Sequence, residues 1–163
     1  MKKYILVTFI SLCTLFGAHA EAGDIAVAPQ FAFATKHATA GFGLQAQFDA
    51  TDNVRVAPEF IFYFKSDNIT SYNGNINVHY LIPKSEKVTF YPLAGLSYGR
   101  YKIEWKDENG EDEKELHDRL GANFGAGAVY KIQEQLDLFA EERFQLMKDF
   151  TQSVTVLGVR FTF

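Results

Sequence analysis

The chain has 163 residues, of which 47% are hydrophobic, 15% aromatic and 22% charged, and this composition excludes a disordered tail or a collagen-like repeat. Its single cysteine excludes both a disulfide framework and a cysteine-based metal site. The net charge of −4 does not suit a nucleic-acid-binding protein.

The first twenty residues have the pattern of a secretory signal. Two lysines precede an apolar run at 4–15, and a small-x-small cleavage site ends at Ala20. The run is shorter than the roughly 20 residues that a membrane-spanning helix needs. We therefore predict a signal peptide at 1–20 and one mature domain at 21–163, which keeps 14 of the 16 basic and all 20 acidic side chains.

The mature sequence contains four related units. The motif at 25–31 recurs at 54–60, in part at 88–93, and more weakly at 136–141. Each unit begins with a strand-like run of period two and returns through a second run. The return runs lie at 40–49, 72–82, 120–131 and 154–163. The pattern predicts eight strands in four hairpins.

The connections between these strands alternate in length. Tight polar turns join one unit to the next, at 50–53, 83–87 and 133–135. Longer loops lie within the units, at 35–39, 65–71, 102–119 and 148–152. Short turns at one end and longer loops at the other are typical of outer-membrane barrels, and strands of about ten residues suit a tilted crossing of the bilayer. The fold class that we predict is all-β, an eight-stranded antiparallel up-and-down transmembrane β-barrel with both termini in the periplasm.

The two faces of the predicted strands differ in composition. One face carries Phe, Leu, Ile and Val with Glu142 as its only charge, and the other carries neutral amides, a few charges and nearly all the strand glycines, Gly74 being the exception. Glycines and amides suit a narrow interior better than a water-facing surface. The polar face is therefore predicted to line the interior, and the apolar face to contact lipid.

Two features oppose regular pairing. Pro29, Pro58 and Pro92 lie at equivalent positions inside predicted strands, where each removes a ladder hydrogen bond. We expect a β-bulge to accommodate each proline. Glu142 on the lipid face is expected either to sit on a bulged strand or to lie near water, because an ionised carboxylate in hydrocarbon is costly.

These residues resemble a known family, the small eight-stranded outer-membrane β-barrels of the opacity and porin-like superfamily. The resemblance rests on the signal peptide and on the segments 90–99, 121–130, 139–143 and 156–163. Phe163, preceded at alternate positions by Leu157, Val159 and Phe161, resembles the signal read by the barrel assembly machinery. The resemblance implies the outer membrane of a Gram-negative bacterium, with outer-membrane lipid and the assembly machinery as partners. It carries no specific function, because family members include adhesion and invasion factors and barrels without an assigned role.

The first candidate site is a charged interior. Its predicted members are Arg55, Glu59, Glu141, Arg143 and Arg160, with Arg160 expected beside Glu141. Such charges could form an ion path or a salt-bridged plug. We favour the plug, because eight strands leave an interior just wide enough for side chains, which also excludes a large diffusion pore.

The second candidate site is the acidic segment 102–119, which we predict to form a protruding extracellular hairpin. Its key residues are Tyr101, Ile103 and Trp105 on the approach and the tight-turn pair Asn109 and Gly110. The hairpin could pair with a strand of an extracellular protein, hold a divalent cation weakly, or simply be a soluble loop. The spacing of its acids does not match a calcium-binding loop, and we predict no metal and no cofactor.

A hydrolase is a further alternative. Only His37 could approach Ser153 and Asp149, since the first and last strands must be neighbours in a closed barrel. No motif surrounds these residues, so we predict that the protein is not an enzyme but a monomeric structural or adhesion-like barrel. A soluble periplasmic barrel that binds an apolar ligand remains a third hypothesis, and it requires an apolar interior.

Overall fold

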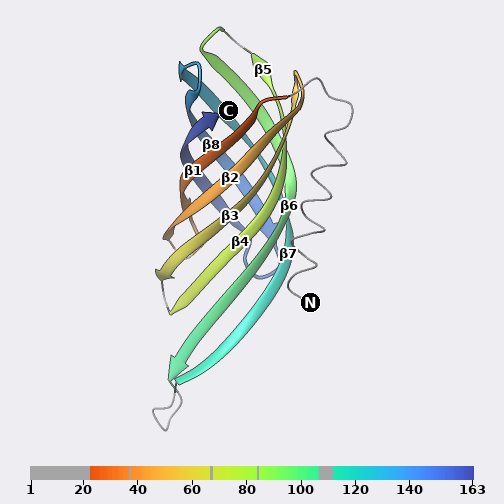
Figure 1. Cartoon of the computed structure of the whole chain (residues 1–163). Helices are drawn as coiled ribbons and strands as arrows, with labels where there is room; N and C mark the ends of the chain where they lie inside the picture. Colours follow the sequence, from red (N-terminus) through yellow and green to blue (C-terminus); the bar gives the residue numbers. More distant parts are fainter. Residues whose placement is uncertain (1–22, 37, 67, 84, 107–111) are drawn as a thin grey trace, which may run out of the picture.

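The computed structural model describes residues 23–163 except 37, 67, 84 and 107–111, and Figure 1 shows a single closed wall of strands. The strands are β1 (Ile25–Ala34), β2 (Thr39–Thr51), β3 (Val54–Ser66), β4 (Ile69–Tyr80), β5 (Ile82–Pro83), β6 (Val88–Lys106), β7 (Asp112–Gln133), β8 (Leu136–Met147) and β9 (Gln152–Thr162). The two-residue β5 only extends β4 along β6. The predicted eight-stranded antiparallel barrel is confirmed.

Sequential strands pair as neighbours, and β1 pairs with β9 to close the barrel. Buried and exposed residues alternate along the strands because successive side chains point to opposite faces of a sheet. Large apolar side chains such as Phe42, Leu96 and Leu157 are exposed on the outside. Within the described residues, no helix is long and apolar enough to span a membrane.

The two ends of the barrel differ. At the end that we call the terminal end, the backbone N–H of Phe163 donates to the carbonyl of Ile25, and the chain turns tightly between consecutive strands. At the opposite end, the hairpin end, β6 and β7 run for 19 and 22 residues, whereas the other wall strands have 10 to 13. Figure 1 shows this pair projecting well past its neighbours.

The loops at the hairpin end are shorter than we expected. The strands β3 and β4 continue to Ser66 and from Ile69, so most of the predicted loop 65–71 is strand. Most of the predicted loop 102–119 likewise belongs to β6 and β7, which confirms a protruding hairpin. Its predicted turn pair, Asn109 and Gly110, lies outside the described residues.

The expected bulges at the prolines are absent. On one side of Pro29, Pro58 and Pro92, two residue pairs are missing from the ladder, and pairing resumes in the same register. A proline has no N–H to donate, so one ladder is interrupted while the other continues through it. The register shifts instead occur near strand ends, at Asp49/Thr51, Tyr63/Ser66 and Lys131/Gln133.

Glu142 is also accommodated without a bulge. Its pairing with Ala126 on β7 and Thr155 on β9 lies in unbroken register. The carboxylate is on the outer face, where it accepts hydrogen bonds from the hydroxyls of Ser153 and Thr155. These two donors offset part of the cost of placing a carboxylate on that face.

Candidate functional site

The centre of the barrel interior holds a cluster of three charged side chains. Arg143 on β8 lies with its Nη2 atom 2.5 Å from Oε1 of Glu59 on β3, and with Nη1 3.4 Å from Oε2 of Glu141. All three side chains are almost fully buried. The structure therefore brings together three of the five predicted interior residues in one ion-paired unit.

Neutral side chains complete this cluster. Three amides donate to the Glu59 carboxylate, from Gln30 at 2.7 Å, Gln45 at 3.2 Å and Asn75 at 2.6 Å. The Tyr91 hydroxyl donates to Glu141 at 2.9 Å, and the buried ring of His79 stacks on Tyr91 with a centroid distance of 4.5 Å. The cluster links five strands, β1, β2, β3, β4 and β8, and reaches β6 through Tyr91.

The other two predicted interior residues lie nearer the terminal end. Arg55 pairs with Asp49 through Nε and Oδ1 at 2.5 Å, and Arg160 pairs with Asp137 at 2.7 Å. Arg160 also lies 3.4 Å from Asp49, so the four side chains form a second cluster. The expected contact of Arg160 with Glu141 is wrong, because the β8–β9 register places Arg160 opposite Asp137.

Asp49 and Asp137 were missed from the sequence. Asp49 follows Gln45 and Gln47 at the inward period-two positions of β2, which is a usable signal. Asp137 shares the inward period-two positions of Glu141 and Arg143 on β8, which is also a usable signal, but its pairing with Arg160 follows only from the β8–β9 register, which a single sequence does not provide.

Aromatic side chains fill the barrel mouth at the hairpin end. Tyr101 and Phe150 stack with their ring centroids 3.7 Å apart, and Met147 and Ile69 pack against them. Tyr101, which we expected on the protruding hairpin, is thus buried in the mouth with 2% exposure. Phe150 is buried there as well, because the loop after β8 folds over the mouth and the left-handed φ of 67° at Asp149 turns the chain.

The protruding hairpin begins just past this mouth. Ile69 and Ile103 form the last β4–β6 pair, and Gly121 and Met147 form the last β7–β8 pair. Ile103 itself is half-buried, and Trp105, two residues beyond it, is 39% exposed. On its β8 side, β7 therefore has no partner strand from Asp112 to Leu120 within the described part of the chain.

An ion-paired triad lies at the base of the hairpin. Glu104 accepts from Nζ of Lys102 at 2.6 Å and from Nζ of Lys65 at 2.5 Å. These hydrogen bonds, first that of Lys102 and then that of Lys65, lower the pKa of Glu104 from 4.5 to about 2. The triad connects the end of β3 to β6, at the point where the hairpin leaves the barrel wall.

The lowered pKa of Glu104 predicts a pH dependence for the hairpin base. A carboxyl group with a depressed folded-state pKa stabilises the fold above its unfolded value, and that stabilisation is lost as the pH falls from about 4.5 through about 2. An NMR titration of the Glu104 side chain in the folded protein should give a midpoint near pH 2. In Lys65→Gln/Lys102→Gln the midpoint should rise towards 4.5, and an unchanged midpoint would show that the lysines are not the cause.

The residues of the hydrolase alternative have other partners. The Ser153 hydroxyl donates to Glu142 on the outer face, and the Asp149 carboxylate accepts from Arg119 at 3.1 Å. His37 lies outside the described residues. No group of three or more His, Cys, Asp or Glu side chains that could hold a metal occurs in the part of the chain that the structure describes.

The predicted assembly signal is at the end of β9. Leu157, Phe161 and Phe163 are exposed, and Val159 is partly exposed on the same outer face. Their alternation follows from the period of the strand. The structure places these side chains together, and their role as an assembly signal stays a prediction.

Comparison with known proteins identifies the fold family. Residues 16–163 match the family described as outer membrane protein beta-barrel domain. The chain belongs to this family. It is therefore an outer-membrane β-barrel protein, and the hypothesis of a soluble periplasmic barrel is wrong. No curated protein sequence is similar enough to match the chain.

Solved structures share the same fold. The N-terminal β-barrel domain of Pseudomonas aeruginosa OprF superposes with a TM-score of 0.71 at 19% identity, covering 86% of this chain and 98% of that one. The attachment invasion locus protein Ail of Yersinia pestis, in complex with the heparin analogue sucrose octasulfate, gives 0.60 at 18%, covering 86% and 99%. Neisserial surface protein A gives 0.57 at 22%, covering 86% and 95%. At these identities the likeness concerns the fold alone.

Proposed function

We propose that this protein is a non-enzymatic barrel in the outer membrane of a Gram-negative bacterium, which binds an extracellular protein through the β6–β7 hairpin. In this proposal the hairpin end faces outward, the termini lie in the periplasm, and the chain acts as a monomer. The observation that carries the proposal is the free edge of β7, which has no partner strand beyond Gly121 on its β8 side within the described residues.

The register indicates which backbone groups face this edge. The backbone N–H of Glu104 donates to the carbonyl of Asn68, so the backbone N–H and C=O groups of Glu104 are directed away from β7. Glu104 pairs with Lys114. In an antiparallel pair the backbone groups of both residues are directed either towards each other or away from each other, so the backbone groups of Lys114 are directed away from β6. Every second residue follows, so Leu116 and Asp118 also direct their backbone groups to the free edge. An extended segment of another protein can add to such an edge as a further strand.

The filled interior argues against a wide pore. The Arg143 cluster lies at the centre of the barrel, and the stacked Tyr101 and Phe150 rings close one mouth. Arg55 and Arg160, with their aspartates, lie near the other end. Eight strands enclose a space that side chains can fill, and these residues occupy three successive levels of it.

The substitution Leu116→Pro tests the proposed strand addition. It removes an N–H that faces the free edge, and an edge strand tolerates proline because that N–H has no partner within the barrel. We expect the variant to fold, as judged by a heat-dependent gel shift, and to lose binding of purified outer-membrane vesicles to host-cell surfaces. A Leu116→Ala variant should retain most of the binding, since it keeps the backbone donor.

A second variant separates backbone pairing from damage to the hairpin. Glu115 faces β6 rather than the free edge, so Glu115→Pro should break the β6–β7 ladder and abolish both hairpin order and binding. Equal binding by Leu116→Pro and the unmodified protein would contradict strand addition. Equal binding by a chain whose β6 and β7 are joined directly below residue 102 would contradict any role of the hairpin.

A further inference from the structure

The two faces of the hairpin differ in charge, although the segment as a whole is acidic. Even-numbered residues of β6 and β7 point outward from the barrel, as the exposure of Leu96 and Tyr98 and the burial of Gly99 and Tyr101 indicate. The described charged side chains on the outward face of the hairpin base are Lys65, Arg100, Lys102, Lys114, Glu104 and Asp118. Four cations therefore meet two carboxylates on this face.

The opposite face of the hairpin is acidic. The inward-parity residues Glu113, Glu115 and Arg119 leave an excess of negative charge above the mouth. The cations thus gather on one side of the hairpin, the side that continues the lipid-facing surface. The composition of 102–119 indicates a uniformly acidic segment, whereas the structure separates its positive and negative charges onto two faces.

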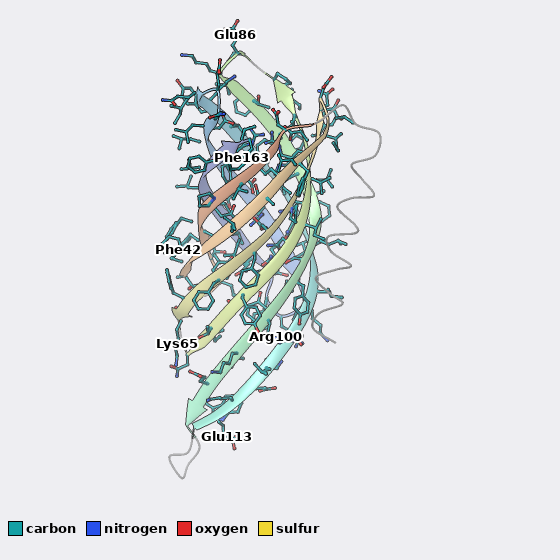
Figure 2. The ribbon with its side chains drawn as sticks, viewed as in Figure 1. Phe42, Lys65, Glu86, Arg100, Glu113 and Phe163 are labelled. Carbon is teal, nitrogen blue, oxygen red and sulfur yellow. The ribbon has the colours of Figure 1, made fainter. Side chains whose placement is uncertain are left out.

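The tyrosines beside the cationic face indicate its level relative to the membrane surface. Tyr72 and Tyr98 lie on the outer surface beside Arg100, whose Nη2 atom donates to the Tyr98 hydroxyl at 3.0 Å. Tyrosine rings mark the level where hydrocarbon gives way to headgroups. Figure 2 shows Lys65 and Arg100 in the same band of the barrel, between Phe42 and the tip residue Glu113. In a bilayer we therefore expect lipid headgroups to face this band.

We propose that the outward face of the hairpin base, formed by Lys65, Arg100 and Lys102, binds the phosphate of a lipid headgroup in the adjoining leaflet. Glu104 and Asp118 orient the cations without neutralising them all, and an ammonium group has three N–H donors, of which Lys65 and Lys102 each give one to Glu104. The Arg100 guanidinium is similarly aligned by Asp118 at 2.5 Å. The bound lipid holds the base of the hairpin against the membrane surface.

The test compares lipids that differ only in the headgroup. The full protein is reconstituted in phosphatidylcholine bilayers containing either spin-labelled phosphatidic acid, which carries a phosphate monoester, or spin-labelled phosphatidylcholine. Electron paramagnetic resonance measures the fraction of each lipid held at the protein surface. We expect a several-fold preference for phosphatidic acid that falls to about one in Lys65→Gln/Lys102→Gln.

The matched control removes two lysines from the other end. Lys87, in the turn before β6, and Lys131, near the end of β7, are exposed at the terminal end, away from the hairpin base, so Lys87→Gln/Lys131→Gln should keep the full preference. Lys65→Arg/Lys102→Arg should keep it as well. A gel shift on heating checks that every variant is folded. Equal loss in the two double glutamine variants, or no loss in either, would overturn the site.

A competition experiment distinguishes a site for lipid phosphate from a site for free inorganic phosphate. Inorganic phosphate, added at constant ionic strength, should leave the preference for phosphatidic acid in place, because the site lies at the headgroup level and binds lipid that is already concentrated there. Complete displacement by inorganic phosphate would show a general phosphate site and overturn the proposal of a lipid site.

Discussion

Replacing Arg143 with methionine should lower the free energy of unfolding by about 3–5 kcal/mol, the range for breaking one side of a buried ion pair. Arg143 is 1% exposed and is the cation shared by Glu59 and Glu141. Without it, two carboxylates lie close together in the barrel centre with no counter-ion. Urea unfolding in lipid vesicles, followed by the loss of the unheated gel band, measures the effect.

The control for this prediction removes all the charges together. In the triple variant Glu59→Gln/Glu141→Gln/Arg143→Met no buried charge is left unpaired, and much of the lost stability should return. A single variant as stable as the unmodified protein would show that the cluster contributes no electrostatic stabilisation. Failure of the triple variant to regain stability would attribute the loss to packing around Arg143.

Gly95→Val should destabilise the barrel by about 1–3 kcal/mol, because it overpacks the contact between β6 and β4. A Cβ atom at Gly95 would lie 2.4 Å from the carbonyl oxygen of Ile76 and 2.8 Å from Cα of Asn77. Backbone atoms of a paired strand cannot move aside as a side chain can, so the strands must separate locally. The same urea unfolding experiment measures the change.

Gly74 supplies the matched control on the neighbouring strand. It points outward, and a Cβ atom there meets nothing within 4 Å. Gly74→Ala should therefore raise stability by about 0.5–1 kcal/mol, the usual cost of glycine in a strand. If Gly95→Val and Gly74→Ala shifted the unfolding midpoint equally, close approach of the backbones would not explain the glycines inside the barrel.

The sequence alone determined the wall of the barrel and its two faces. A period of two places alternate side chains on opposite sides of any strand, so Phe42 and Leu157 had to share a face, and Gln45 and Arg143 the other. The four repeated units also predicted the number of strands. Both inferences depend only on the spacing of residues along one strand or one hairpin, and a single sequence contains that spacing.

The partners of the charged residues depended on the tertiary structure. A shift of register by any even number of residues keeps every side chain on its face but changes the side chain opposite, and this is why the sequence alone could not show that Arg160 contacts Asp137 rather than Glu141. The placement of Tyr101 and Phe150 in the mouth also depends on a loop folding across the barrel. The two-residue alternation along each strand therefore determined which residues face inward. The closure of the barrel decided which of these residues contact one another, because contacts across the interior join strands that are distant in sequence.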